Sequence, residues 1–148
     1  MKAYERDKSP HKVNQIRNVA WNEQLFAAYK DIARRGFEEG VFYQVDDSEL
    51  SGEQVIWLGP AEKPIGLITF YDNAAEKQAL WISALWVEPE HRQKGWGYFL
   101  VERVRNYAMS LGYKTIQLGV LPENVKMHAL MKRISFNRRS VTYDWKAP

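Results

Sequence analysis

Apolar residues in the first third of the chain recur at the spacing of an α-helix. Four of them fall on one face between residues 13 and 36, which predicts a helix over that range, either continuous or broken near Trp21 and Asn22. Gly36 and Gly40 mark its end. The residues of the apolar face are Leu25, Tyr29, Ile32 and Ala33.

Three segments with the composition of strands come next. Residues 55–58 are short and apolar, residues 65–71 are rich in β-forming residues, and residues 79–87 form an apolar run that only Ser83 interrupts. The turns between them are short, so the pattern predicts an antiparallel meander whose last strand is covered on both faces. Before them, residues 46–52 form an acidic loop, either a solvated loop or an entrance that attracts amines.

Helices and strands alternate in the rest of the chain. The pattern predicts a helix over 97–111, capped by Gly112, and a strand over 115–120. A second helix over 124–134 and a strand over 140–145 follow. This order predicts an α/β fold of the α+β kind, in which helices pack on a mixed sheet.

The composition narrows the class of protein. A chain of 148 residues with 45% hydrophobic and 26% charged residues predicts one folded domain over 1–148. The absence of cysteine excludes disulfides, thiolate metal sites and cysteine nucleophiles, and it favours a reducing, cytoplasmic location. A net charge of +3 gives little support for nucleic acid binding. The longest apolar run is too short to span a membrane, and the three histidines lack the spacing of a metal site.

The strongest local signal is a glycine turn between the strand over 79–87 and the helix over 97–111. It reads Arg92-Gln93-Lys94-Gly95-Trp96-Gly97. Glycines let a ligand approach the backbone and the helix dipole adds positive charge, so the turn predicts a phosphate site, with further charge from Arg92 and Lys94. A tight turn that needs two glycines is the alternative. The spacing matches neither the dinucleotide fingerprint nor a P-loop, which disfavours both of those classes.

With its surroundings, this turn resembles the hallmark of the GNAT family of N-acetyltransferases. The family pattern is Arg/Gln-x-x-Gly-x-Gly/Ala after a strand that often ends in Val-x-Pro, and here Val87-Glu88-Pro89 precedes Arg92, Gly95 and Gly97. A second block resembles the family's Asn-x-x-Ala-x-x-Leu-Tyr-x-Lys-x-Gly-Phe. It matches at Asn124, Leu130 and Phe136, with Arg133 in place of the lysine. The resemblance covers the chain from about residue 55 onwards.

The resemblance implies an acetyl-coenzyme A-dependent N-acetyltransferase that transfers the acetyl group directly to a primary amine of a small molecule or protein. It implies a mostly antiparallel sheet with helices on both faces and a parallel pair of strands that splay apart at the coenzyme site. The turn would hold the pyrophosphate, the end of the long strand would pair with the pantetheine arm, and the asparagine of the second block would contact the coenzyme. The residues carried over are Leu85, Trp86, Val87, Arg92, Gln93, Lys94, Gly95, Trp96, Gly97, Tyr98 and Asn124.

The resemblance also assigns candidate catalytic groups. The backbone amide of Val87 would stabilise the oxyanion. The family's tyrosine acid falls at Met131, which cannot donate a proton and which has the position of a core residue on an apolar stripe. Tyr143 is the candidate substitute, with Tyr98 and His128 as alternatives, although the lysines near His128 are typical of a solvated helix face.

The base is a separate question. Glu88 is the candidate because it lies close to the turn, and surface-exposed carboxylates at Glu88 and Glu90 are the alternative. Trp96 lies between the two glycines and is expected to be partly exposed, covering the coenzyme or a partner. Since the acid and base are not placed by the pattern, a second class stays open: a non-catalytic GNAT-fold module that binds coenzyme or a protein. The predicted partners are acetyl-coenzyme A and an amine, without a membrane; the oligomeric state, a homodimer included, is left open.

Overall fold

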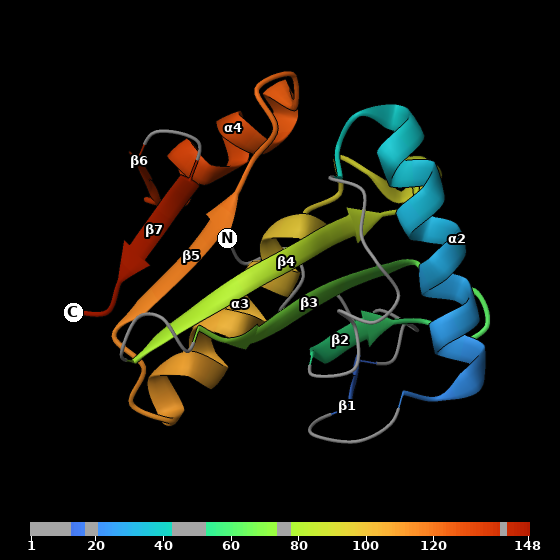
Figure 1. Ribbon diagram of the computed structural model, residues 1–148, viewed down its shortest axis with the longest axis horizontal. Coiled ribbons are helices and arrows are strands. Elements are labelled where there is room, and N and C mark those ends of the chain that lie inside the picture. The colour runs from blue at the N-terminus through green and yellow to red at the C-terminus, as the bar shows by residue number, and fades with distance from the viewer. Residues whose placement is uncertain (1–12, 17–20, 43–52, 74–77, 140–141) are drawn as a thin grey trace.

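The computed structural model describes residues 13–16, 21–42, 53–73, 78–139 and 142–148, so the acidic loop predicted over 46–52 lies outside it. Within these residues, seven strands form one sheet in the order β1-β2-β3-β4-β5-β7-β6 (Figure 1). The strands are β1 (Val13–Ile16), β2 (Gln54–Leu58), β3 (Gly66–Asp72), β4 (Ala79–Val87), β5 (Thr115–Gly119), β6 (Asn137–Arg139) and β7 (Thr142–Lys146). The helices are α2 (Glu23–Glu39), α3 (Trp96–Ser110) and α4 (Val125–Arg133), with a short 3-10 turn η2 (Pro89–His91).

The middle of the sheet has the predicted arrangement. Strands β2, β3 and β4 pair antiparallel as a meander, and β4 has the predicted bounds. Strand β4 then pairs in parallel with β5, which pairs antiparallel with β7. The prediction of a mixed, mostly antiparallel sheet is therefore confirmed.

The prediction of a helix is wrong for the first residues of the range 13–36. Residues Val13–Ile16 form β1, which pairs antiparallel with β2. A segment of four residues with apolar ends can form either a helical turn or a strand. Here it forms a strand, because pairing with the open edge of β2 satisfies the backbone hydrogen-bonding groups of both segments. The side chain of Asn14 adds a bond from Nδ2 to the Gly59 carbonyl at 3.3 Å.

Helix α2 begins at the break predicted near Asn22. The side-chain oxygen of Asn22 accepts from the amides of Gln24 at 2.8 Å and Leu25 at 3.2 Å, which is the role of an N-cap. The helix continues past Gly36, the end of the predicted range, to Glu39, and Gly40 caps it with a φ of 82°, the left-handed conformation of a C-cap. Both ends of α2 are therefore fixed by its own sequence.

Helices cover both faces of the sheet, as predicted (Figure 1). On one face, α2 packs over residues of β2, β3 and β4, Trp86 among them. On the other face, α3 and α4 enclose a larger core that includes Leu100 and Met131. Trp96 is also part of this core at 8% exposure and packs edge-on against Phe99, so the expectation of a partly exposed Trp96 is wrong.

The second half of the chain alternates as predicted, with shifted ends. Helix α3 starts at Trp96 and α4 follows its cap, Asn124. The predicted last strand over 140–145 corresponds to β7, with residues 140–141 outside the described part of the chain. Strand β6 has no sequence signal, because Asn137–Arg139 is short and polar and is extended by pairing with β7.

Candidate functional site

Strands β4 and β5 separate halfway along β4. Their parallel pairing ends at Ile82 opposite Leu118, and beyond that point the two strands diverge (Figure 1). At the same place the register between β3 and β4 shifts by one residue, which leaves Ser83 as an extra residue in β4. A bulge of this kind bends and twists a strand. It turns the second half of β4 away from β5, which confirms the predicted splayed pair.

Backbone groups at the end of β4 face this gap. The amide of Glu88 donates to the Ile65 carbonyl at 2.8 Å, on the side of β3. Backbone groups of successive strand residues alternate between the two neighbouring strands, so those of Leu85 and Val87 face the side of β5. An extended ligand in the gap can therefore pair with β4 as an added strand does.

The glycine turn forms a concave backbone surface at the start of α3. Gln93 and Gly95 both have left-handed backbone conformations, with φ of 63° and 89°. Gly95 is the N-cap of α3 and provides no side-chain cap, and a helix N-terminus of this kind binds anions. A Cβ on Gly97 would have Leu130 at 3.6 Å and Leu85 at 4.0 Å as its nearest neighbours, so this glycine leaves space between those side chains.

The gap and the turn open into a cavity of about 570 Å³. That volume is typical of small-molecule sites. Lys94 does not line it. The other predicted coenzyme-binding residues all do: Leu85, Trp86, Val87, Arg92, Gln93, Gly95, Trp96, Gly97, Tyr98 and Asn124.

Two walls of the cavity were missed by the sequence patterns. The end of α2 forms one wall, and no local signal marks it because its place depends on how α2 packs on β4. One face of α4 forms the other, and its apolar spacing was a signal that indicated only core packing. Asn124 fixes where this wall begins, since its Oδ1 accepts from the Met127 amide at 3.2 Å. The missed lining residues include Glu39, Gly40, Val41, Met127 and Leu130.

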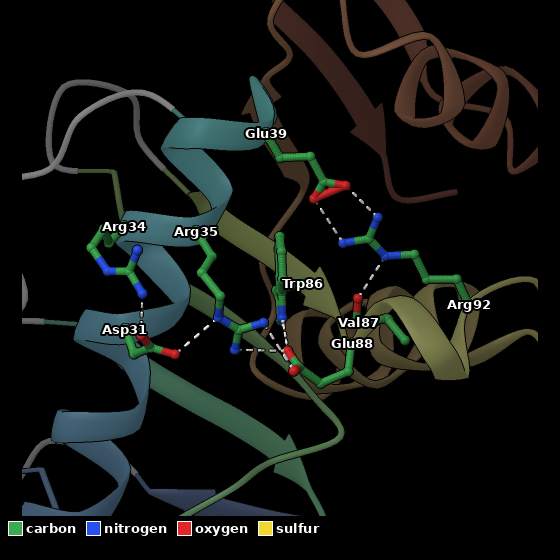
Figure 2. A network of polar contacts seen from close by, with 8 residues as sticks. All are labelled: Asp31, Arg34, Arg35, Glu39, Trp86, Val87, Glu88 and Arg92. Carbon is green, nitrogen blue, oxygen red and sulfur yellow. Dashed lines mark hydrogen bonds and ion pairs between the residues drawn. The ribbon is translucent and has the colours of Figure 1, made fainter.

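Arg92 joins the glycine turn to the ends of β4 and α2 (Figure 2). Its Nε donates to the Val87 carbonyl at 2.7 Å, and its two terminal nitrogens donate to the Glu39 carboxylate at 2.6 and 3.0 Å. Its guanidinium also lies 4.7 Å from the ring centroid of Trp86. The hydrogen bonds from Arg92 lower the pKa of the Glu39 carboxyl, which keeps it ionised.

Glu88 belongs to a second ion pair and is not at the surface. It is 8% exposed, so the expectation of a surface carboxylate is wrong for Glu88, whereas Glu90 is exposed. Arg35 of α2 donates to its two oxygens at 3.0 and 3.1 Å, and the indole N–H of Trp86 donates to it as well (Figure 2). This carboxylate accepts from three donors and does not line the cavity.

Of the candidate acids, Tyr98 lines the cavity, whereas Tyr143 and His128 lie away from it. Met131 is fully buried in the core, as its apolar stripe predicts. Tyr143 is 5% exposed, and its hydroxyl lies 2.6 Å from Nδ1 of His128. The other ring nitrogen of His128 lies 3.0 Å from the Leu121 carbonyl, which can only accept, so in the neutral ring Nδ1 accepts from Tyr143. The expectation of a solvated His128 is therefore wrong, and neither ring lines the cavity.

Hydroxyl groups gather beside the bulge on the face that α2 covers. The hydroxyls of Ser83 and Thr69 lie 2.6 Å apart, and Thr69 is fully buried. Tyr29 of α2 packs on the same face, where burial raises the pKa of its hydroxyl and the charge of Glu53 raises it further. Tyr29 is therefore neutral at physiological pH, and its hydroxyl, with those of Ser83 and Thr69, is an uncharged hydrogen-bonding group on this face of the sheet.

Two other features are absent from the described residues. No group of three His, Asp or Glu side chains lies close enough together there to hold a metal ion. No helix of that part of the chain is long and apolar enough to cross a membrane.

Comparisons of the sequence and of the structure with known proteins all find acetyltransferases. The sequence profile described as "Acetyltransferase (GNAT) family" matches residues 13–136. An uncharacterized N-acetyltransferase of Methanocaldococcus jannaschii is 26% identical over 87 residues, which are 56% of this chain and 38% of that protein. Thialysine N-epsilon-acetyltransferase of Bos taurus is 23% identical over 124 residues, 84% of this chain and 73% of that protein. Among solved structures, the PaiA N-acetyltransferase of Thermoplasma acidophilum in complex with coenzyme A has a TM-score of 0.72 at 12% identity, covering 94% of this chain and 100% of its own.

Proposed function

This chain belongs to the acetyltransferase (GNAT) family, and from that premise we propose that it transfers an acetyl group from acetyl-coenzyme A to a primary amine of a small molecule or protein. The observation that carries the proposal is the cavity of about 570 Å³ that joins the gap beside β4 to the N-terminus of α3. It combines an open strand edge for an extended arm with a helix terminus for phosphates. Those are the two chemically distinct parts of the acyl donor that this family uses.

The residues of the cavity fit coenzyme A. Its pyrophosphate lies at the backbone amides of residues 93–98, where the dipole of α3 favours negative charge. The pantetheine arm pairs with the backbone of Leu85 and Val87, which faces the gap. Lys126 and Arg133 on the α4 wall add positive charge to the same cavity.

The end of β4 also provides a donor for the transfer step. The bound coenzyme supplies an activated thioester. The amide of Val87 faces the gap and stabilises the negative charge that develops on the acetyl oxygen when the amine attacks. This donor is fixed in a paired strand before the reaction, so it needs no reorganisation, and a donor of this kind is typically worth about 10²–10³-fold in rate.

Proton transfers are left to solvent in this proposal. Met131 cannot donate a proton, and the Glu88 carboxylate is held by Arg35 and Trp86. A thiol has a pKa of about 8.5, so the thiolate leaves without an acid, although more slowly. Holding the amine and thioester together then supplies most of the rate enhancement.

A non-catalytic module that binds coenzyme remains the second candidate function. The buried Met131 favours it, because the family's tyrosine acid falls at that position. Release of free thiol from acetyl-coenzyme A across a broad panel of amines separates the two. Thiol release that depends on one class of amine supports the enzyme, and coenzyme binding without turnover over the panel supports the module.

The first experiment is a thermal-melt titration with acetyl-coenzyme A, with ATP and NADP as phosphate-bearing controls. At 100 times its Kd the ligand adds about 2.7 kcal/mol of stability, a rise in Tm of about 5–10 °C for a chain of this size. Gly95→Glu places a side chain and a negative charge in the turn and should abolish the shift. Ser110→Glu adds the same charge at the exposed far end of α3 and should keep it. Equal shifts with all three ligands, or a full shift in Gly95→Glu, contradict the proposed site.

Location and assembly are also proposals. A cytoplasmic location rests on the absence of cysteine, which suits a reducing compartment. The homodimer that the sequence left open is tested by sedimentation of the purified chain.

A further inference from the structure

Glu39 is an acidic residue in the wall of a cavity that takes a polyanion. It is the last residue of α2, and its carboxylate belongs to the lining together with the glycine turn. The last turn of α2 carries no basic residue, and the C-terminus of a helix disfavours negative charge. The position is therefore unfavourable for the helix and for a phosphate ligand, and the charge of Arg92 offsets both effects.

The ion pair that compensates Glu39 is accessible to water. The side chain of Arg92 is 25% exposed and that of Glu39 is 38% exposed. Arg92 binds Glu39 through its two terminal nitrogens, while its Nε binds the Val87 carbonyl. The end of the guanidinium can therefore change partner without loss of the bond that anchors its base (Figure 2).

We propose that Glu39 is a positioning residue that holds Arg92 until the coenzyme binds, and that the pyrophosphate then displaces Glu39 from the guanidinium. This exchange rests on the proposed function, since it needs a diphosphate at the glycine turn. Arg92 is only three residues before Gly95 and lines the same cavity. The exchange makes the affinity for coenzyme depend on a residue of α2, outside the glycine turn itself.

The exchange is favourable because of charge and geometry. A diphosphate carries more charge than a carboxylate and binds a guanidinium through two parallel hydrogen bonds. The displaced carboxylate keeps a positively charged neighbour, because Lys126 lies on the α4 wall of the same cavity and its charge already lowers the pKa of Glu39. Coenzyme binding thus transfers Glu39 from the turn toward α4.

The second ion pair of Figure 2 stays in place during the exchange. Arg35 lies one turn before Glu39 on α2 and binds Glu88, whose side chain is 10% exposed and which does not line the cavity. Phosphates in the cavity do not reach it. Helix α2 therefore remains attached to β4 at Arg35 while its last turn is released.

A double-mutant cycle tests the exchange, with coenzyme A Kd values measured by calorimetry at fixed ionic strength. Glu39→Gln removes the competitor for Arg92, so it should tighten binding by about twofold to fivefold, the fold-change that corresponds to an exposed ion pair. In an Arg92→Gln background the same substitution should have a smaller effect, because no guanidinium remains to be released. Simple repulsion of the phosphates predicts the reverse, a larger gain once Arg92 no longer neutralises Glu39.

Glu38→Gln is the matched control. It makes the same charge change one residue earlier, on a side chain that is 61% exposed and paired with Arg34, and it should leave the Kd unchanged. Glu39→Gln should also leave the Tm of the free protein equal or slightly lower, so that stability and affinity move in opposite directions. Weaker or unchanged binding in Glu39→Gln, or a larger gain in the Arg92→Gln background, overturns the exchange while leaving the proposed function intact. If the unaltered protein binds no coenzyme A, both proposals fall.

Discussion

Replacement of Glu88 by glutamine is the sharpest test of how the end of β4 is held. The substitution keeps the size of the side chain and removes its charge. The carboxylate accepts two hydrogen bonds from Arg35 at 3.0 and 3.1 Å and a third from Trp86. Hydrogen bonds to a charged group are each worth about 1.5–3 kcal/mol, and loss of one partner of a fully buried pair costs about 3–5 kcal/mol.

The side chain of Arg35 is 34% exposed, which places the expected cost below the fully buried case. Water can solvate the guanidinium once its partner is neutral, so we expect a loss of about 2 kcal/mol in the free energy of unfolding. For 148 residues this lowers Tm by about 4–8 °C. Circular dichroism during thermal and urea unfolding measures both quantities.

Glu38→Gln provides the control for Glu88→Gln. Its ion pair with Arg34 is exposed on both sides, so the loss should stay within about 0.5 kcal/mol. Equal effects of the two substitutions, or a loss below about 0.5 kcal/mol for Glu88→Gln, refute the assignment of a structural ion pair at Glu88.

The same variant decides whether Glu88 is a base. A positioned general base is worth about 10²–10⁴-fold, so its loss would lower kcat by that factor and remove a limb of the pH profile. Because Glu88 does not line the cavity, we expect kcat within about threefold of the unaltered protein and the same pH profile, with a modest rise in KM for acetyl-coenzyme A. The assay is thiol release well below the Tm of the variant.

Three further predictions follow from the described contacts. Tyr143→Phe removes the hydrogen bond to His128, so it should cost about 1 kcal/mol of stability and change kcat by less than about threefold, whereas a fall of about 10²-fold would restore Tyr143 as the acid. Asn22→Ala removes the N-cap of α2 and should cost about 1 kcal/mol in urea unfolding, while Asn22→Asp should cost little; equal losses contradict the cap. Burial raises the pKa of Tyr29 above its ordinary value of about 10, so its contribution to the free energy of unfolding is present below pH 10 and is lost as the pH rises further. In Tyr29→Phe the free energy of unfolding should therefore fall less steeply between about pH 9 and 11. An unchanged pH dependence refutes this.

The elements that the sequence predicts well are those fixed by local chemistry. The apolar run of β4, the glycine turn, the break near Asn22 and the end of α2 next to Gly40 depend on residues close to one another in the chain, and the structure confirms each of them. Strands β1 and β6 are four and three residues long, and their strand form depends on pairing with a distant edge. Residue pattern alone carries no information on that pairing.

The burial of single residues cannot be predicted from the local sequence for the same reason. Glu88 follows a strand and precedes a proline, which is the local setting of a surface residue. Its burial comes from Arg35, 53 positions earlier in the chain. His128 has lysines nearby in sequence, but the ring bonds with Tyr143 on another strand. The wall formed by the end of α2 is likewise a product of tertiary packing. The motif therefore predicts the lining of the cavity at β4 and the glycine turn, but not the residues that position it.

The two ion pairs between α2 and the end of β4 together fix how the helix lies. Arg35 binds Glu88 and Glu39 binds Arg92, so both pairs join residues 53 apart, and their signs are reversed along the helix. A slip of α2 by one turn would bring Glu39 opposite Glu88, where like charges repel. The indole of Trp86 lies within 5.4 Å of the Arg35 guanidinium and 4.7 Å of that of Arg92, so it contacts both cations and donates to Glu88 as well. One register satisfies all of these contacts, and that register places the last turn of α2 in the cavity wall. The same charge pattern that specifies the packing of α2 therefore positions Glu39 where a phosphate ligand can compete for Arg92.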